Sequence, residues 1–114
     1  MSEYRSAGKT TISHEVLLTI ARQAALEVEG VQRMAPVKGT VRDLFDHRSD
    51  GVRINIEDGL VFVDLFLVLK HDVNVRDVGR QVQTAVARAI SEMTGLETGH
   101  VNIHIEDIEY PSEA

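Results

Sequence analysis

Histidine and carboxylate side chains are the groups in this sequence that could bind a metal ion or move a proton. There are five histidines and no cysteine. His100 and His104 are four residues apart in a stretch that alternates like a strand, so about 13 Å separates them, too far to share one ion. Asp43, Asp46 and His47 could gather on one helical turn, but they lack the full set of convergent ligands that a site needs. We therefore predict no metal site.

No motif in the sequence assembles a nucleophile, a base or a phosphate-binding loop. Gly8-Lys9-Thr10 resembles the end of such a loop, but neither a glycine-rich segment nor a strand precedes it. Ser13, Ser49 and Ser91 have no histidine base placed by a recognisable motif, and the acids follow no paired pattern. The sequence therefore predicts no catalytic residues, no cofactor and a protein that is not an enzyme.

Composition and charge restrict the partners and the location of the protein. Its 114 residues suffice for one domain, and 12 basic against 18 acidic residues give a formal net charge of −6, which repels nucleic acid and anionic lipid surfaces. The longest apolar run, residues 60–69, is broken by Asp64 and is shorter than the ~20 residues of a membrane-spanning helix. No charged start followed by an apolar stretch marks a signal peptide. We expect a cytoplasmic protein that neither binds nucleic acid nor inserts directly into a membrane.

Residues 51–70 frame the rest of the chain, because two runs of alternating apolar residues meet there at Asp58-Gly59. That dipeptide is typical of a two-residue hairpin turn. With this turn, Arg53 faces Asp64, and a slip of one residue would exchange the two sides of either strand. One side then forms the core and carries Val52, Ile54, Ile56, Val61, Val63, Leu65, Leu67 and Leu69.

The opposite side of this hairpin is more apolar than a sheet face in water should be. It carries four apolar side chains, Leu60, Phe62, Phe66 and Val68. We predict that these four form a contact surface between copies of the chain or with a partner protein. The competing explanation is that residues 31–50 cover them within one chain through their own apolar side chains, Met34, Val37, Leu44 and Phe45.

The first predicted helix follows Ser13, whose side chain can cap the free amide groups of the first turn. Apolar residues recur every three or four positions over residues 16–28, which indicates a helix that packs by one face. Gly30 supplies the left-handed position that ends helices. Before this helix, residues 9–12 form a short β-prone run that we expect to add an edge strand.

The second predicted helix begins at Asn74, a helix cap with Asp77 three residues later. Its apolar face extends over residues 75–93, and Gly95 follows as the stop. Gly79 inside this helix costs ~1 kcal/mol relative to alanine. Either another backbone approaches closely there, or the glycine lies on a solvated side of the helix.

The last predicted strand covers residues 101–110, with a bulge at Glu106-Asp107 where the alternation shifts. The order is then β-α-β-β-α-β, which predicts an α+β fold with two helices packed on one face of a four-stranded, mainly antiparallel sheet, in a split βαβ arrangement. We expect a single domain over residues 1–114, with its core in 8–110, a loop at 31–50 and mobile ends at 1–7 and 111–114.

Six segments in order resemble one bacterial family, namely residues 8–13 (GKTTIS), 16–31, 51–56 (GVRINI), 82–86, 93–96 (MTGL) and 101–103 (VNI). Over residues 8–108 the chain resembles the alkaline-shock-protein (Asp/Gls) envelope stress response family. The resemblance implies a small, cytosolic, non-enzymatic protein. Some members are tethered under the membrane by a separate anchor protein, some self-associate, and some are linked to cell-envelope or fatty-acid homeostasis. His71-Asp72 stands where the family tends to have an aromatic residue and a glycine.

Two functional hypotheses follow. The first is a non-enzymatic interaction or scaffold protein of the bacterial cytoplasm, acting by self-association and partner binding, and reaching the membrane through a membrane-anchored protein partner. The second is a small-molecule-binding regulatory module linked to lipid or envelope metabolism, with residues 31–50 as a lid over the apolar side of the hairpin. The oligomeric state in solution and a thermal-shift screen with metabolites separate the two.

Overall fold

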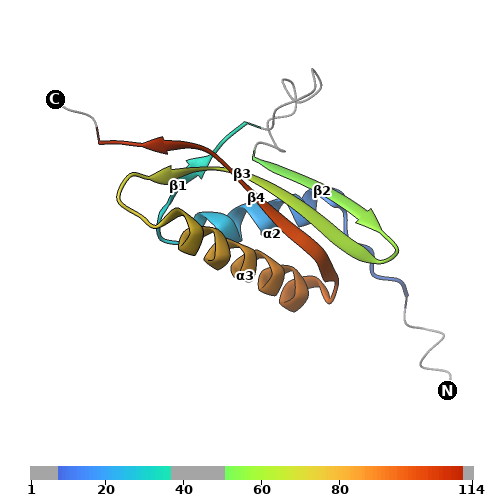
Figure 1. Cartoon of the computed structure of the whole chain (residues 1–114). Helices are drawn as coiled ribbons and strands as arrows, with labels where there is room; N and C mark the ends of the chain where they lie inside the picture. Colours follow the sequence, from blue (N-terminus) through green and yellow to red (C-terminus); the bar gives the residue numbers. More distant parts are fainter. Residues whose placement is uncertain (1–7, 37–50, 112–114) are drawn as a thin grey trace.

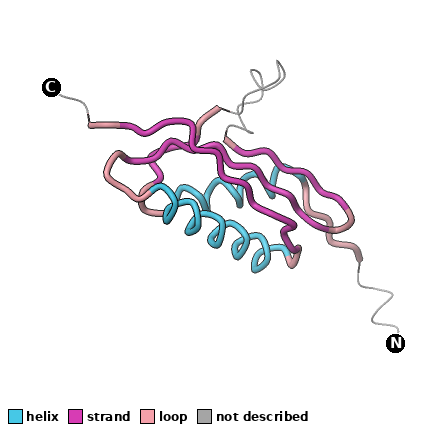
Figure 2. The backbone as a smooth tube through the Cα atoms, in the orientation of Figure 1, coloured by secondary structure: helices cyan, strands magenta, loops and turns pink. Residues whose placement is uncertain are grey.

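Two helices cover one face of a four-stranded sheet (Figure 1). The computed structural model describes residues 8–36 and 51–111. In chain order the elements are α2 (His14–Leu26), β1 (Val31–Met34), β2 (Val52–Glu57), β3 (Leu60–Lys70), α3 (Val75–Thr94) and β4 (Glu97–Glu109). Figure 2 shows both helices on the same side of the strands. The predicted α+β class, with two helices on one face of a mainly antiparallel sheet, is confirmed.

β3 is the centre of the sheet, and β1 and β2 both pair with the same edge of it. Both pairings are antiparallel. The amide of Phe66 donates to the carbonyl of Gly51 (2.9 Å), and its carbonyl accepts from the amide of Ala35 (2.8 Å). Because the N–H and C=O of one strand residue point to one edge, β1 and β2 lie end to end along that edge. β4 runs parallel to β3 on the other edge, so the sheet is three strands wide.

The predicted hairpin register is confirmed, including the pairing of Arg53 with Asp64. Asp58 and Gly59 both have positive φ angles, 53° and 78°, as a type I′ turn requires. One core assignment is wrong, because Ile56 is 45% exposed. α2 begins next to Ile54, where the Nε2 atom of His14 lies 2.9 Å from its carbonyl oxygen, so Ile56 lies beyond the helix toward the turn.

The core lies between the sheet and the two helices. Five alternate residues of β3 have no exposed surface, namely Val61, Val63, Leu65, Leu67 and Leu69. α3 adds one buried residue per turn, namely Val78, Val82, Val86 and Ile90. Its predicted apolar face is too long at both ends, since Val75 and Met93 are exposed. A Cβ atom added at Gly79 would meet nothing within 4 Å, so a close approach by another backbone is wrong there.

Helix α2 begins as predicted but ends earlier. The hydroxyl of Ser13 accepts from the amide of Val16 (3.2 Å), which confirms the cap. The helix ends at Leu26 rather than at Gly30. Gly30 has a φ of 108° and instead turns the chain into β1, where its carbonyl accepts from the amide of Lys70. The capping of α3 by Asn74 and its end at Gly95 are both confirmed.

The strand expected at residues 9–12 is absent from the described part of the chain. Residues 31–34 form β1 instead and take the place beside the end of β3, so the described order is α-β-β-β-α-β. The split βαβ arrangement is also wrong, because β3 and β4 are direct neighbours. The bulge at Glu106 is confirmed, and a second one occurs at Gly99. No helix among the described residues is long and apolar enough to cross a membrane.

Candidate functional site

The face of the sheet opposite the helices carries the polar and aromatic side chains that could act on a partner. We call it the open face. Alternation within each strand brings side chains of β2, β3 and β4 onto it, and the register arranges them in rows. One row joins Arg53, Asp64 and Asn102, and Phe62 and Phe66 are paired with His100 and His104 in the flanking rows.

Asp64 is the centre of a small polar network on the open face. Its Oδ1 atom lies 3.0 Å from Nε2 of His104 and accepts a 3.3 Å hydrogen bond from the side chain of Asn102. Partial burial raises the pKa of Asp64. Hydrogen bonds from these two residues and the positive charges of His104 and Arg53 outweigh burial, so the pKa lies below its ordinary value of 3.8. The carboxylate is therefore ionised at neutral pH.

The two histidines each pack on a phenylalanine. His104 stacks on Phe66, with ring centroids 4.6 Å apart and an interplanar angle of 11°. The guanidinium carbon of Arg53 lies 5.5 Å from the centre of the same phenylalanine ring. His100 meets Phe62 edge to face at 4.8 Å. These geometries are typical of favourable aromatic and cation–π contacts, so the open face is an ordered surface.

The bulge at Gly99 makes room for Phe62. A Cβ atom added at Gly99 would lie 2.1 Å from the ring of Phe62. Glycine at this point of β4 therefore lets the phenylalanine ring lie over the neighbouring strand and contact His100. The signal in the sequence was a single glycine, which we had not linked to the open face.

The four predicted interface residues differ in exposure. Phe66 is 7% exposed and Val68 2%, whereas Leu60 and Phe62 are half-buried. Among the proposed covering residues, Met34 lies on the helix side of the sheet and packs against the main core. The other three, Val37, Leu44 and Phe45, lie outside the described residues.

The chemistry available on the open face is recognition. Within the described residues, Asp64 is the hydrogen-bond partner of the His104 side chain. A dyad of this kind without a nucleophile does not form a covalent intermediate. In the described ranges, no group of three or more histidine, aspartate or glutamate side chains is placed to hold a metal ion. The pairing of His104 with Asp64 was missed in the sequence, where both strand histidines were interpreted as solvent-facing.

Fold and site together define a two-layer α+β domain with a bare sheet face rich in aromatic and charged side chains. Solved structures share this architecture. One variant of MamM-CTD aligns over 85% of this chain and 100% of its own, with a TM-score of 0.53 and 14% identity. A copper form of another MamM-CTD variant has the same TM-score at 13% identity, again over 85% and 100% of the two chains. At such identities the likeness shows the fold.

The chain belongs to the alkaline-shock-protein (Asp/Gls) family, which is described as having a cell envelope-related function and matches residues 2–110. It is 32% identical to the uncharacterized protein YqhY of Bacillus subtilis over 110 residues, covering 94% of this chain and 82% of YqhY. It is 34% identical to the uncharacterized protein Spy1535 of Streptococcus pyogenes over 104 residues, covering 89% and 79%. The family that the sequence resembles is thereby confirmed.

Proposed function

We propose that this protein is a non-enzymatic interaction protein of the bacterial cytoplasm, with a role at the cell envelope. It acts by self-association and by binding a protein partner, and a membrane-anchored partner would bring it to the membrane. The surface involved is the open face, through the predicted set of Leu60, Phe62, Phe66 and Val68. The envelope-related family supports the setting of this role.

The observation that carries the proposal is the half-buried pair Leu60 and Phe62 on a face of the sheet. Water-facing strand positions are usually polar, and Arg53, Asn55 and Glu57 beside this pair obey that rule. Phe66 and Val68 are buried already, so they would support the surface from below rather than form its rim. Covering Leu60 and Phe62 in a complex would contribute a few kcal/mol, at about 25 cal/mol per Å² of apolar area, before the cost of lost rotation and translation.

Sedimentation velocity at high protein concentration tests the proposal. The wild-type protein is expected to sediment as an oligomer, and Phe62→Lys as a folded monomer with an unchanged far-UV circular dichroism spectrum. Asn55→Lys is the matched control, because Asn55 is exposed and lies directly opposite Phe62 in the hairpin register. It adds the same side chain without removing apolar surface.

Two results would contradict this function. One is a wild-type protein that stays a strict monomer at high concentration and recovers no partner from a bacterial lysate. The other is dissociation by Asn55→Lys as completely as by Phe62→Lys, which would attribute the effect to charge.

The second candidate is a small-molecule-binding regulatory module linked to lipid or envelope metabolism. A hollow of about 590 Å³ on the open face favours it, lined by Arg53, Ile54, Asn55, Glu57, Phe62, Asp64 and His100. An aromatic ring beside a guanidinium and a carboxylate suits an organic ligand with polar groups. A specific thermal shift of a monomeric wild-type protein by an acyl or nucleotide metabolite, lost in Phe62→Lys, would favour this module over the first candidate.

A further inference from the structure

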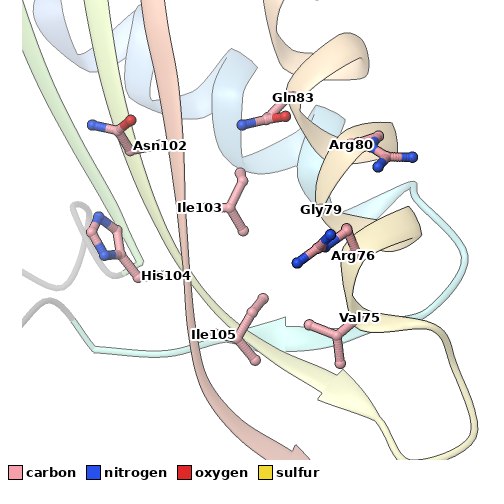
Figure 3. Close-up of a pocket in the computed structure, with 9 residues that line it drawn as sticks. All are labelled: Val75, Arg76, Gly79, Arg80, Gln83, Asn102, Ile103, His104 and Ile105. Atoms are coloured by element: carbon pink, nitrogen blue, oxygen red, sulfur yellow. The ribbon is translucent and has the colours of Figure 1, made fainter.

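A second surface lies away from the open face, in a groove between α3 and β4 (Figure 3). Its volume is about 580 Å³. Nine residues line it, namely Val75, Arg76, Gly79, Arg80, Gln83, Asn102, Ile103, His104 and Ile105. Figure 3 shows that Ile103 and Ile105 point from β4 toward the helix, whereas Asn102 and His104 point to the other side. The groove therefore has an apolar floor on its strand side.

One wall of the groove is the outer edge of β4, a strand of 13 residues whose partner among the described residues is β3. The carbonyl of Val101 accepts a 3.0 Å hydrogen bond from the side chain of Gln83, so it faces away from β3. Backbone groups of alternate strand residues face the same edge, which turns the N–H and C=O of Ile103 and Ile105 outward. A long edge strand of this kind is a template for a further strand.

The opposite wall is low because of Gly79. Glycine is a poor residue for the interior of a 20-residue helix, and no neighbour within 4 Å of its missing Cβ atom requires it. Packing within the described residues therefore does not explain this glycine. Its effect is to leave open the space between α3 and the outer edge of β4.

The charge in the groove is positive in a protein that is acidic as a whole. Arg76 and Arg80 line the groove, and its nine lining residues include no aspartate or glutamate, against a net charge of −6 for the chain. Arg80 lies 3.7 Å from Asp77, and its side chain points away from β4 (Figure 3). Arg76 points toward β4, and in the described ranges it has no hydrogen bond or ion pair. A carboxylate in the groove would meet this guanidinium.

We propose that the groove binds an extended, acidic segment of a partner protein, which adds to the sheet as a strand beside β4. The backbone of the segment pairs with the outward N–H and C=O groups of Ile103 and Ile105. Its apolar side chains lie on Ile103, Ile105 and Val75, and an acidic side chain pairs with Arg76. This mode of recognition combines backbone hydrogen bonds for affinity with alternate side chains for specificity. It uses a surface separate from Leu60 and Phe62.

Fluorescence anisotropy with a fluorescein-labelled peptide of three Val-Glu repeats tests the proposal on the full chain. We expect saturable binding, which Arg76→Glu weakens about tenfold or more by charge reversal. Gly79→Leu should weaken it as strongly by filling the groove, while leaving the helix intact. Arg88→Glu is the matched control, because it makes the same charge change at an exposed position of α3 outside the groove. It should leave the affinity within about twofold.

Two further peptides and one direct readout separate strand addition from general attraction. A peptide with proline at its centre, which lacks a backbone donor, should bind far more weakly, as should a peptide of Val-Lys repeats. Hydrogen exchange at the amides of Ile103 and Ile105 should slow when the Val-Glu peptide is bound.

Several outcomes would overturn the proposal. These are no saturable binding, equal binding of the Val-Lys peptide, or insensitivity to both Arg76→Glu and Gly79→Leu. Self-association of the wild-type protein that these two variants abolish would identify the occupant as a second copy of this chain instead. Phe62→Lys should leave peptide binding unchanged, so a failure here is distinguishable from a failure of the proposed function.

Discussion

Asp64 receives hydrogen bonds from two side chains of β4 and faces Arg53 of β2, so one carboxylate joins three strands. Its pKa is lowered because these partners favour the charged form more than partial burial disfavours it. A group whose pKa is lower in the folded state stabilises the fold above its unfolded pKa. That contribution is lost as the pH falls through the folded value.

Asp64→Asn should therefore lower the unfolding free energy at pH 7 by about 1 kcal/mol or less, since the carboxyl is partly exposed. The difference from wild type should shrink as the pH falls from about 5 toward 2, where the wild-type carboxylate becomes protonated. Urea unfolding at several pH values measures it. Asp72→Asn, an exposed carboxylate after β3, is the control. A difference that stays constant down to pH 2 would contradict an electrostatic origin.

At the residue scale, the sequence predicted which side chains face away from the core but not what they contact. Arg53 opposite Asp64 followed from the turn at Asp58-Gly59 alone. The stacking of His104 on Phe66 depends on a parallel neighbour strand and on the extra residue at Gly99, and both are long-range properties. Local alternation contains no information about the register of a parallel partner.

At the element scale, two glycines near α3 and β4 have opposite roles. Gly99→Ala would place a methyl group against the ring of Phe62, so we expect a loss of about 1–3 kcal/mol in unfolding free energy. Gly79→Ala meets no neighbour and improves the helix, so we expect a gain of up to about 1 kcal/mol. Chemical denaturation of the two variants measures both changes.

A double mutant shows whether the Gly99 effect comes from Phe62. In the background of Phe62→Ala, Gly99→Ala should cost much less than in the wild type, because the ring it would strike is absent. Equal costs in the two backgrounds would mean that the glycine serves the backbone of the bulge instead.

Elements with local signals were predicted well, and elements that depend on a distant partner were not. Caps at Ser13 and Asn74 and the hairpin turn are determined within a few residues. An edge strand forms only where a neighbour offers free backbone groups. Residues 31–34 therefore became β1 beside the end of β3, whereas the β-prone residues 9–12 did not form a strand.

At the scale of the whole molecule, β1, β2 and β3 meet around Phe66, whose two backbone groups bind Ala35 and Gly51. Gly51 has a φ of 78°, and a Cβ atom there would lie 2.5 Å from the Cβ atom of Met34. Gly51→Ala should therefore destabilise the fold by about 2–4 kcal/mol, through strain and overpacking together.

Gly59→Ala provides the matched comparison for this junction. Its φ is also 78°, but a Cβ atom there meets nothing within 4 Å. Only the backbone strain remains, so we expect a loss of about 1 kcal/mol. Thermal or urea unfolding of both variants measures the difference, and equal losses would show that the contact with Met34 has no cost.

The end-to-end arrangement of β1 and β2 also bears on how sequences of this kind can vary in length. Ala35 and Gly51 bond to the same residue of β3, so the chain leaves and rejoins the sheet at one point. Each half of the interrupted strand takes its register from β3 independently of the other. Residues gained or lost between them alter only the entropy of closing a loop, about 0.6 kcal/mol for each doubling of length. Relatives can therefore acquire new surface at this point without shifting a single pair in the sheet.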